Sequence, residues 1–237
     1  MKNILMSLIV TLCSFMYAGS SAPKENTEEM ILQRYDIFKK TMVINNFKDS
    51  LLISNSIYYK NIEKILSTDQ FNSIDVQYEI IVTAKRLCLN PEWLTFVIYK
   101  ESRGITTATN PISGAAGLIG YLPSTAECLG YDISTIKKMT FKEQLPIVDL
   151  YFRNSGKLHE IESYEDSYLC VFYPSAIGKS NIYRLGIKPS KKTLEAYLKK
   201  GKKMPFKQAV YYGNSSMDVN KNGIITVKEF KTYANII

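Results

Sequence analysis

Residues 90–126 read NPEWLTFVIYKESRGITTATNPISGAAGLIGYLPSTA, and the first third of this stretch has the pattern of a helix. Asn90 is a favourable N-cap, and Pro91 suits the first helical position, where its missing N–H is not needed. Gly104 is a suitable residue for the end of the helix. Side chains at i, i+3, i+4 and i+7 share one face of it: Leu94, Val97, Ile98 and Glu101. A carboxylate therefore extends an apolar stripe.

The position of Glu101 predicts an unusual carboxyl group. Partial burial and the negative end of the helix dipole both disfavour its ionised form, so we expect its pKa to lie above that of a solvated glutamate. A raised pKa would let the group donate a proton at neutral pH. The alternative is that Glu101 lies at the edge of the stripe and reaches solvent, as charged side chains usually do.

The segments that follow Glu101 resemble, in their order and spacing, the soluble-type lytic transglycosylases, which share a lysozyme-like fold with the goose-type lysozymes. The matching segments are Glu101-Ser102, an Ala-x-Asn ending at Asn110, the Gly-Ala-x-Gly-Leu of residues 114–118 and the Pro-Ser-Thr-Ala of residues 123–126. The resemblance covers about residues 76–185. It implies a mainly α protein with a lysozyme-like helical domain.

The same resemblance implies roles for particular residues. Glu101 would be the catalytic carboxylate, and Ser102 beside it would help to hold the acid or the substrate. The remaining substrate-binding positions lie in the loop after the helix: Asn110, Gly114, Ala115, Gly117 and Leu118. Family members usually continue with Met-Gln, and that glutamine contacts the substrate. This chain has Ile119-Gly120, so the acetamido group of the sugar would be held differently or more weakly.

Two later segments resemble phage-type members of the family. Residues 141–152, FKEQLPIVDLYF, predict an amphipathic helix with Pro146 near its start or kinking it, and their Glu-Gln-Leu packs under the site in those members. Residues 172–175, FYPS, replace the usual Ala-x-Tyr-Asn-Ala-Gly element, and Tyr173 would be the tyrosine that lines the cleft. The alternative for Tyr173 is a core residue, because its neighbours Leu169 and Phe172 are apolar.

Residues 1–20 have the pattern of a secretory signal peptide, with Lys2 before a mostly apolar run and small residues after it. The run is short for a membrane span, although an uncleaved anchor is the alternative. Cleavage predicts an exported protein, periplasmic or extracellular. The mature chain then keeps Cys88, Cys128 and Cys170, which allow three pairings of one disulfide or three buried free thiols.

The charge of the chain favours an anionic partner. The formal net charge is +8 and the isoelectric point is about 9.1. Peptidoglycan carries acidic peptides and fits, whereas nucleic acid fits the charge but neither export nor any recognisable binding motif. We therefore expect a monomer at the cell wall or membrane surface that binds no nucleic acid. His159 stands in a polar stretch, and a single histidine with these cysteines does not build a zinc site.

We expect the chain to be organised in five segments. They are a signal peptide (1–20), a helical extension (21–75), a lysozyme-like domain (76–187), a lysine-rich linker (188–209) and a small C-terminal unit (210–237). The extension predicts one helix over 25–40 and one or two more over 47–66. It carries no catalytic motif, so it would support the domain or dock a partner.

Residues 218–229, DVNKNGIITVKE, match the calcium-binding loop of the EF-hand. Oxygen ligands would come from Asp218, Asn220, Asn222, Ile224 through its carbonyl, Thr226 and Glu229, with Gly223 at the tight turn. Asparagine at the third and fifth positions places little negative charge on the ion, which predicts weak binding of ~0.1–1 mM and a structural role. The alternative is a turn that has lost its metal.

The resemblance implies a peptidoglycan lytic transglycosylase that cleaves between N-acetylmuramic acid and N-acetylglucosamine. Glu101 would protonate the glycosidic oxygen and then take the proton of the C6 hydroxyl as a 1,6-anhydro ring closes, with no cofactor for catalysis. One alternative is a goose-type muramidase, which would need a second carboxylate such as Asp132 or Asp149 near the sugar. The other is a peptidoglycan-binding or scaffold protein without catalysis, suggested by Gly120.

Overall fold

The computed structural model describes residues 27–53, 59–201 and 203–236 and divides the chain into two units, residues 1–56 and 57–237. Its described part is mainly helical, which confirms the expected mainly α class. The predicted signal peptide lies outside the described residues. No helix in the described ranges combines the length and apolar character needed to cross a bilayer.

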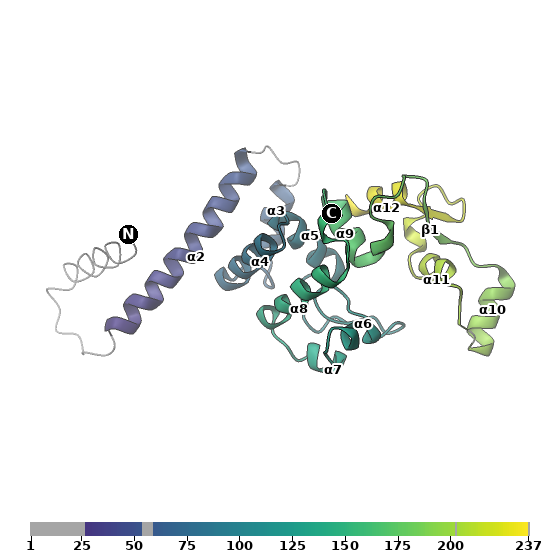
Figure 1. Cartoon of the computed structure of the whole chain (residues 1–237), viewed down its shortest axis with the longest axis horizontal. Helices are drawn as coiled ribbons and strands as arrows, with labels where there is room; N and C mark the ends of the chain where they lie inside the picture. Colours follow the sequence, from purple (N-terminus) through teal and green to yellow (C-terminus); the bar gives the residue numbers. More distant parts are fainter. Residues whose placement is uncertain (1–26, 54–58, 202, 237) are drawn as a thin grey trace. The chain divides into compact units, whose positions relative to one another are not determined.

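The described part of the first unit is one helix, α2 (Thr27–Ile53), where we predicted a helix that ends near residue 40. The second unit begins with α3 (Tyr59–Leu66), α4 (Ile74–Arg86), α5 (Pro91–Ser102), α6 (Pro123–Cys128), α7 (Ile133–Ile136), α8 (Phe141–Asn154), η1 (Leu158–Glu160), α9 (Tyr164–Phe172) and η2 (Pro174–Ala176) (Figure 1). It continues with β1 (Arg184–Ile187), α10 (Lys191–Lys200), α11 (Phe206–Gly213), η3 (Ser215–Met217), β2 (Ile224–Thr226) and α12 (Val227–Ala234).

Helix α5 is the central helix of the second unit. Asn90 caps it as predicted, because its Oδ1 accepts the backbone N–H of Glu92 at 2.9 Å. The helix ends at Ser102, two residues before the predicted stop, and Arg103 follows in a left-handed conformation with φ of 56°. The predicted apolar stripe is fully buried, and so are residues beside it: Leu94, Thr95, Phe96, Val97 and Ile98. Helix α5 is thus covered on more sides than an amphipathic helix would be.

Gly104 allows the chain to turn sharply after α5. Its φ is +75°, and a Cβ at this position would lie 2.5 Å from the ring of Phe71, which is completely buried. A larger residue would therefore be strained and would displace the ring. The close packing at Gly104 directs the following loop back across the unit.

The loop between α5 and α6 has a short β-like core. Ala116 forms antiparallel bridges with Thr109 and with Tyr121, so three passes of the chain lie side by side. Helix α8 packs against this loop and begins with a capping box between Thr140 and Glu143. Pro146 lies inside α8 and is exposed.

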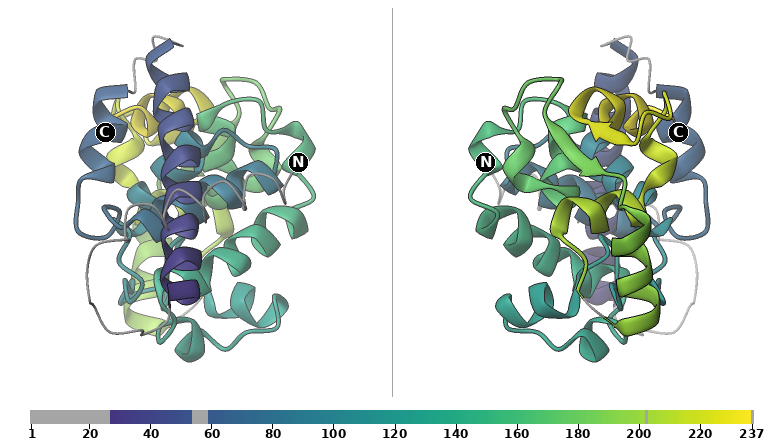
Figure 2. Two further views of the ribbon diagram at one scale, coloured as in Figure 1. Left: turned by 90° about the vertical axis from the view of Figure 1, so that its left-hand side faces the viewer. Right: turned by 90° about the vertical axis from the view of Figure 1, so that its right-hand side faces the viewer.

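The C-terminal part is joined to the rest of the second unit by a two-stranded antiparallel sheet of β1 and β2 (Figure 2). Gly186 pairs with Ile225, and Ile187 pairs with Ile224. The stretch 188–209, which we predicted to be a linker, contains α10 and the start of α11. The division of the chain at Ser56 also differs from the expected boundaries at 75, 187 and 209.

The three cysteines in the described residues are free thiols. Cys170 is buried, and burial raises its pKa to about 11. Of the two alternatives, a disulfide or three buried free thiols, the structure shows free thiols, but Cys88 and Cys128 are exposed.

Candidate active site

Glu101 lies in the last turn of α5 and is partly buried. The hydroxyl of Tyr168, on α9, forms a hydrogen bond with its carboxyl group. Burial raises the pKa of Glu101 to about 7, although the bond from Tyr168 acts in the opposite direction. A group with this pKa is about half protonated at neutral pH. At neutral pH the carboxyl group can therefore donate a proton when it is protonated and accept one when it is ionised.

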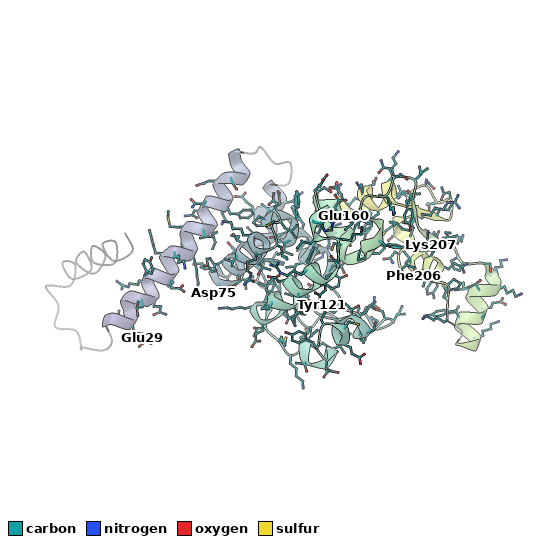
Figure 3. All side chains as sticks on the ribbon, in the orientation of Figure 1. Glu29, Asp75, Tyr121, Glu160, Phe206 and Lys207 are labelled. Carbon is teal, nitrogen blue, oxygen red and sulfur yellow. The ribbon has the colours of Figure 1, made fainter. Side chains whose placement is uncertain are left out.

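Aromatic side chains surround this carboxyl group. Burial, then the charge of Glu101, raises the pKa of Tyr168, and burial is also the main cause of the raised pKa of Tyr151, to which Cys170 and Glu101 contribute. The ring of Tyr151 meets that of Tyr121 edge-on at 6.2 Å, and Tyr121 (labelled in Figure 3) is 1% exposed. Both phenols near the carboxyl group therefore remain protonated and uncharged at neutral pH.

Gly120 brings the loop backbone against the acid. A Cβ at this position would lie 3.2 Å from Oε2 of Glu101, and φ of Gly120 is +66°. A side chain here would adopt a strained backbone conformation and crowd the carboxylate. Gly120, which stands where the family usually has glutamine, therefore lies at a point where the close approach of the backbone to Glu101 favours glycine.

Ser102 is buried, and its hydroxyl is bonded to the backbone at the end of α5. It donates to the carbonyl of Ile98 at 3.2 Å and accepts the N–H of Gly104 at 3.1 Å. The structure places these local bonds where the resemblance implied a contact with the acid or the sugar. The hydroxyl that reaches Glu101 belongs to Tyr168.

Asn110 shapes the tip of the loop. Its Oδ1 accepts the backbone N–H groups of Ile112 at 2.9 Å and Ser113 at 3.1 Å, while its backbone pairs with Ala115 and Gly114. These bonds hold the turn that presents Ile112, whose side chain is 77% exposed. Asn110 itself is exposed, as a residue that meets a ligand must be.

Gln144 of α8 holds the glycine-rich segment of residues 114–118 in place. Its buried Oε1 accepts the N–H of Leu118 at 2.9 Å, and its Nε2 lies within hydrogen-bond distance of three carbonyls, those of Thr106, Ile136 and Met139. Gly117, with φ of +86°, passes so close that a Cβ would lie 2.8 Å from the same Oε1. This glutamine belongs to the Glu-Gln-Leu segment, but its partners could not be read from the sequence.

Tyr173 directly follows α9 and is buried. Its ring meets those of Tyr183 at 6.5 Å and Phe206 at 5.3 Å. Phe206 and Lys207, both labelled in Figure 3, begin α11. Nζ of Lys207 lies 4.6 Å from the ring centre of Tyr183. These contacts are those of a core residue, which was the alternative for Tyr173. The tyrosine that forms a hydrogen bond with Glu101 is Tyr168, five positions earlier on α9.

The candidates for a second catalytic carboxylate are used elsewhere. Asp132 is exposed and caps α7 by accepting the N–H of Ser134 at 2.7 Å. Asp149 forms ion pairs with Arg153 and, at 3.3 Å, with Arg86. Both aspartates therefore have structural partners.

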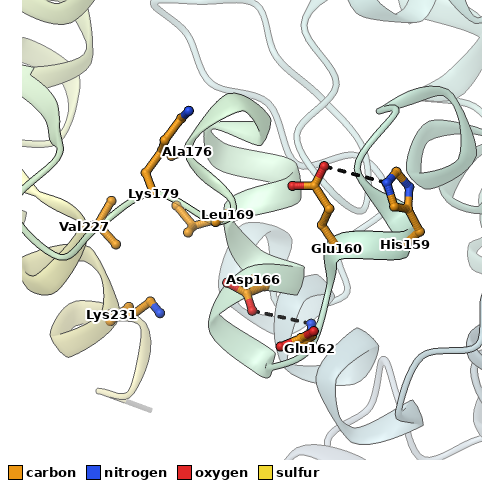
Figure 4. A pocket seen from close by; sticks show the side chains of 10 residues that line it. His159, Glu160, Glu162, Asp166, Leu169, Ala176, Lys179, Val227 and Lys231 are labelled. Carbon is orange, nitrogen blue, oxygen red and sulfur yellow. Dashed lines mark hydrogen bonds and ion pairs between the residues drawn. The ribbon is translucent and has the colours of Figure 1, made fainter.

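Glu101 does not line either of two cavities in the described part of the second unit. One, of about 540 Å³, lies beside α6 and α7. The other, of about 430 Å³, lies between α9 and α12, and both acidic and basic side chains line it (Figure 4). Two of its three carboxylates have partners: Glu160 pairs with Lys157 and His159, and Asp166 accepts the N–H of Glu162. His159 is exposed, as expected.

The loop of residues 218–229 folds around its own oxygen atoms. Asp218 accepts the N–H groups of Asn222 at 3.1 Å and Gly223 at 2.9 Å. The amide oxygens of Asn220 and Asn222 each accept the N–H two residues further on, at 3.0 and 2.8 Å. Glu229 is buried and reaches back across the loop, where its carboxylate accepts from Thr226 and, at 3.5 Å, from the N–H of Asn220.

The donor set of this loop fits calcium in chemistry. Carboxylate, amide and carbonyl oxygens are the ligands that calcium prefers. Ile225 is completely buried, and its pairing with Gly186 holds the loop against β1. In the described residues no group of three or more His, Cys, Asp and Glu is assembled. That finding follows from the asparagines, which leave Asp218 and Glu229 as the acidic members of the set.

No protein-family model matches this chain, and no curated protein or solved structure is significantly similar to it. The geometry around Glu101 therefore carries the functional proposal.

Proposed function

We propose that the protein is a peptidoglycan lytic transglycosylase with a lysozyme-like domain. The observation that carries the proposal is the carboxyl group of Glu101, which is held by Tyr168, close to the backbone of Gly120, with a pKa of about 7. The ordered sequence segments around it support the substrate class. The positive charge and the predicted export support a role at the anionic cell wall.

In this reaction Glu101 acts first as an acid and then as a base. The protonated carboxyl group gives its proton to the oxygen between the two sugars as that bond breaks. The carboxylate then accepts the proton of the C6 hydroxyl, whose oxygen attacks the anomeric carbon and closes the anhydro ring. Tyr168 donates a hydrogen bond to the carboxylate between the two steps. The loop of residues 105–121 contains no Asp or Glu, so it can position a sugar but not deprotonate water.

The contacts made by Asp132 and Asp149 favour a transglycosylase over a muramidase. A hydrolase activates water with a second carboxylate across the sugar. Asp132 is occupied as a helix cap and Asp149 as the partner of two arginines. The substrate's own C6 hydroxyl then takes the place of water. A scaffold without catalysis would not need a buried carboxyl group with a pKa near neutrality.

The products of digestion test this proposal. Purified peptidoglycan is expected to yield fragments that end in 1,6-anhydromuramic acid, lighter by one water than muramidase products, as measured by mass spectrometry. Asp132→Asn and Asp149→Asn are each expected to keep activity within about tenfold, a barrier change of ~1.4 kcal/mol. Ordinary reducing ends, or a collapse of activity in either aspartate variant, would assign the protein to the hydrolases instead.

We also propose that residues 218–229 form an EF-hand loop that binds calcium as a structural ion. The ligands would be the six residues predicted from the sequence, and the low charge of the set predicts weak affinity. Because β2 pairs with β1 and α12 follows directly, an ion in this loop would stabilise a part of the second unit that packs against α9.

Millimolar calcium is expected to raise the thermal midpoint of the protein. A ligand that binds the folded state alone stabilises it by mass action, by about 1.4 kcal/mol at ten times its Kd. Glu229→Ala should remove most of the calcium-dependent increase, because it deletes the bidentate ligand. The readout is the shift between calcium and chelator, since this variant also loses the capping box of α12. Lys228→Ala, an exposed neighbour, should keep the full shift. A parent protein with the same midpoint in calcium and chelator would refute the metal site.

A further inference from the structure

Helix α12 packs against the tyrosine that holds the candidate acid. Phe230 is completely buried, and its ring centre lies 5.0 Å from that of Tyr168 and 5.0 Å from that of Phe172. Tyr164, Tyr168 and Phe172 follow one another at four-residue spacing and therefore share one face of α9. Phe230 is the residue of α12 that fills this aromatic face.

The other end of α12 is tied to α5, the helix that carries Glu101. Nζ of Lys100 donates to the carbonyl of Tyr233 at 3.3 Å and to the carbonyl of Ile236, and it lies 5.0 Å from the ring centre of Tyr233. The hydroxyl of Tyr164 donates to the carbonyl of Ala234 at 3.3 Å. A cation at the carbonyl end of a helix is favoured by the helix dipole. Helix α12 is thus anchored beyond Phe230 as well as at it.

These contacts leave the ring of Tyr168 little freedom. One neighbour is the ring of Tyr164, stacked at 6.3 Å and 13°, and the other is Phe230. The direction of a phenol hydroxyl follows from the position of its ring, and packed aromatic rings restrict that position. Tyr168 therefore reaches Glu101 from a place that Phe230 helps to define.

We propose that Phe230 is a positioning residue for Glu101: by packing on Tyr168 it keeps the Tyr168 hydroxyl within hydrogen-bond reach of the carboxyl group. The catalytic consequence rests on the proposed function, whereas the positioning itself does not. The C-terminal loop and helix then complete the active site rather than forming an appended unit. This joins the calcium loop to the acid, because Glu229 directly precedes Phe230.

The titratable groups that face Glu101 and Tyr168 are phenols, so they are of a different kind from the carboxyl group whose titration is measured. Tyr151 of α8 faces Glu101, while Tyr233 of α12 and Tyr164 of α9 face Tyr168. Burial raises the pKa of Tyr151 and of Tyr168, so these two phenols stay protonated in the range where the carboxyl group titrates.

The test is the pKa of Glu101 measured by ¹³C NMR of carboxyl-labelled full-length protein, a measurement that does not need activity. Phe230→Leu is expected to raise this pKa by about 0.5–1 unit, the shift that corresponds to loss of a single hydrogen bond to the carboxylate. Tyr168→Phe should raise it by a similar amount. The double variant should not exceed Tyr168→Phe alone, because both changes remove the same bond. On the active enzyme, the alkaline limb of kcat/KM should move up with the pKa.

The matched control is Phe141→Leu, which alters another buried phenylalanine of the second unit, packed on Phe71 at 5.5 Å. It should lower stability and leave the pKa of Glu101 unchanged. Phe230→Met replaces Phe230→Leu if the latter does not fold. An unchanged pKa in the Phe230 variants, with a raised pKa in Tyr168→Phe, would overturn the proposal. So would a double variant whose shift is the sum of the two. Full activity of Glu101→Gln would instead refute the proposed function and leave the titration result intact.

Discussion

Glu101→Gln is expected to reduce the rate of peptidoglycan cleavage by at least ~10²-fold, because the amide keeps the shape of the side chain but cannot transfer a proton. Its oxygen can still accept the hydrogen bond from Tyr168, so the surroundings of the site should persist. Release of soluble fragments from purified peptidoglycan measures the rate. Digestion at the parent rate would remove Glu101 from the mechanism.

The same variant should be more stable than the parent protein above pH 7, which separates loss of chemistry from loss of fold. The pKa of Glu101 is raised from 4.5 to about 7 in the folded protein, so folding favours the protonated form. The parent therefore loses stability as pH rises from about 4.5 to about 7, and the loss is complete above that interval. At about 1.4 kcal/mol per pKa unit, this shift of about 2.5 units amounts to roughly 3.5 kcal/mol at most. Thermal midpoints at pH 8 and pH 4.5 should show a gain for Glu101→Gln that is present at the first and absent at the second.

Gln144→Ala is expected to destabilise the second unit by about 3–5 kcal/mol. The change leaves the buried N–H of Leu118 without its acceptor and removes the amide group that faces the carbonyls of Thr106, Ile136 and Met139. It also opens a cavity next to Gly117. Urea unfolding should show a lower midpoint with an unchanged slope. At temperatures where the variant remains folded, the proposed cleavage should also slow, because displacement by about 1 Å of a loop that we propose to bind the substrate can cost ~10²-fold.

Lys142→Ala is the matched control on the same helix. Lys142 is exposed, and its ion pair with Glu79 at 3.5 Å lies at the surface. Its loss should change stability by about 0.5 kcal/mol or less. If Gln144→Ala unfolds at the same urea concentration as Lys142→Ala, the hydrogen bonds of Gln144 do not anchor the loop.

Features that depend on neighbours along the chain could be predicted from the sequence. Asn90 and Pro91 start α5 through bonds made within one turn, and the spacing of Leu94, Val97 and Ile98 placed them in the core. Glu101 followed as a partly buried carboxylate at the end of that helix. The tight turn of residues 218–229 could likewise be predicted, because its oxygen atoms are arranged by hydrogen bonds between residues at most a dozen positions apart.

Features that depend on how the helices pack could not be predicted in this way. Ser102 has a local partner where the resemblance implied a functional one, and the ring of Tyr173 packs against that of Phe206. Tyr168 was passed over because its position on α9 is that of any core aromatic. It acquires a role from α5, which brings Glu101 to it, and from α12, which brings Phe230.

Residue spacing along one segment therefore specified the helix, the acid and the loop that could hold an ion, because dihedral preferences and caps act over a few residues. The partners of the acid and of the glycine-rich loop were specified by packing between segments. Gln144 reaches Leu118 across 26 positions and Thr106 across 38, and hydrophobic periodicity tells which face of a helix is buried but not what covers it. A buried hydrogen bond forms where packing excludes water from both partners, and that condition exists only after the helices have come together.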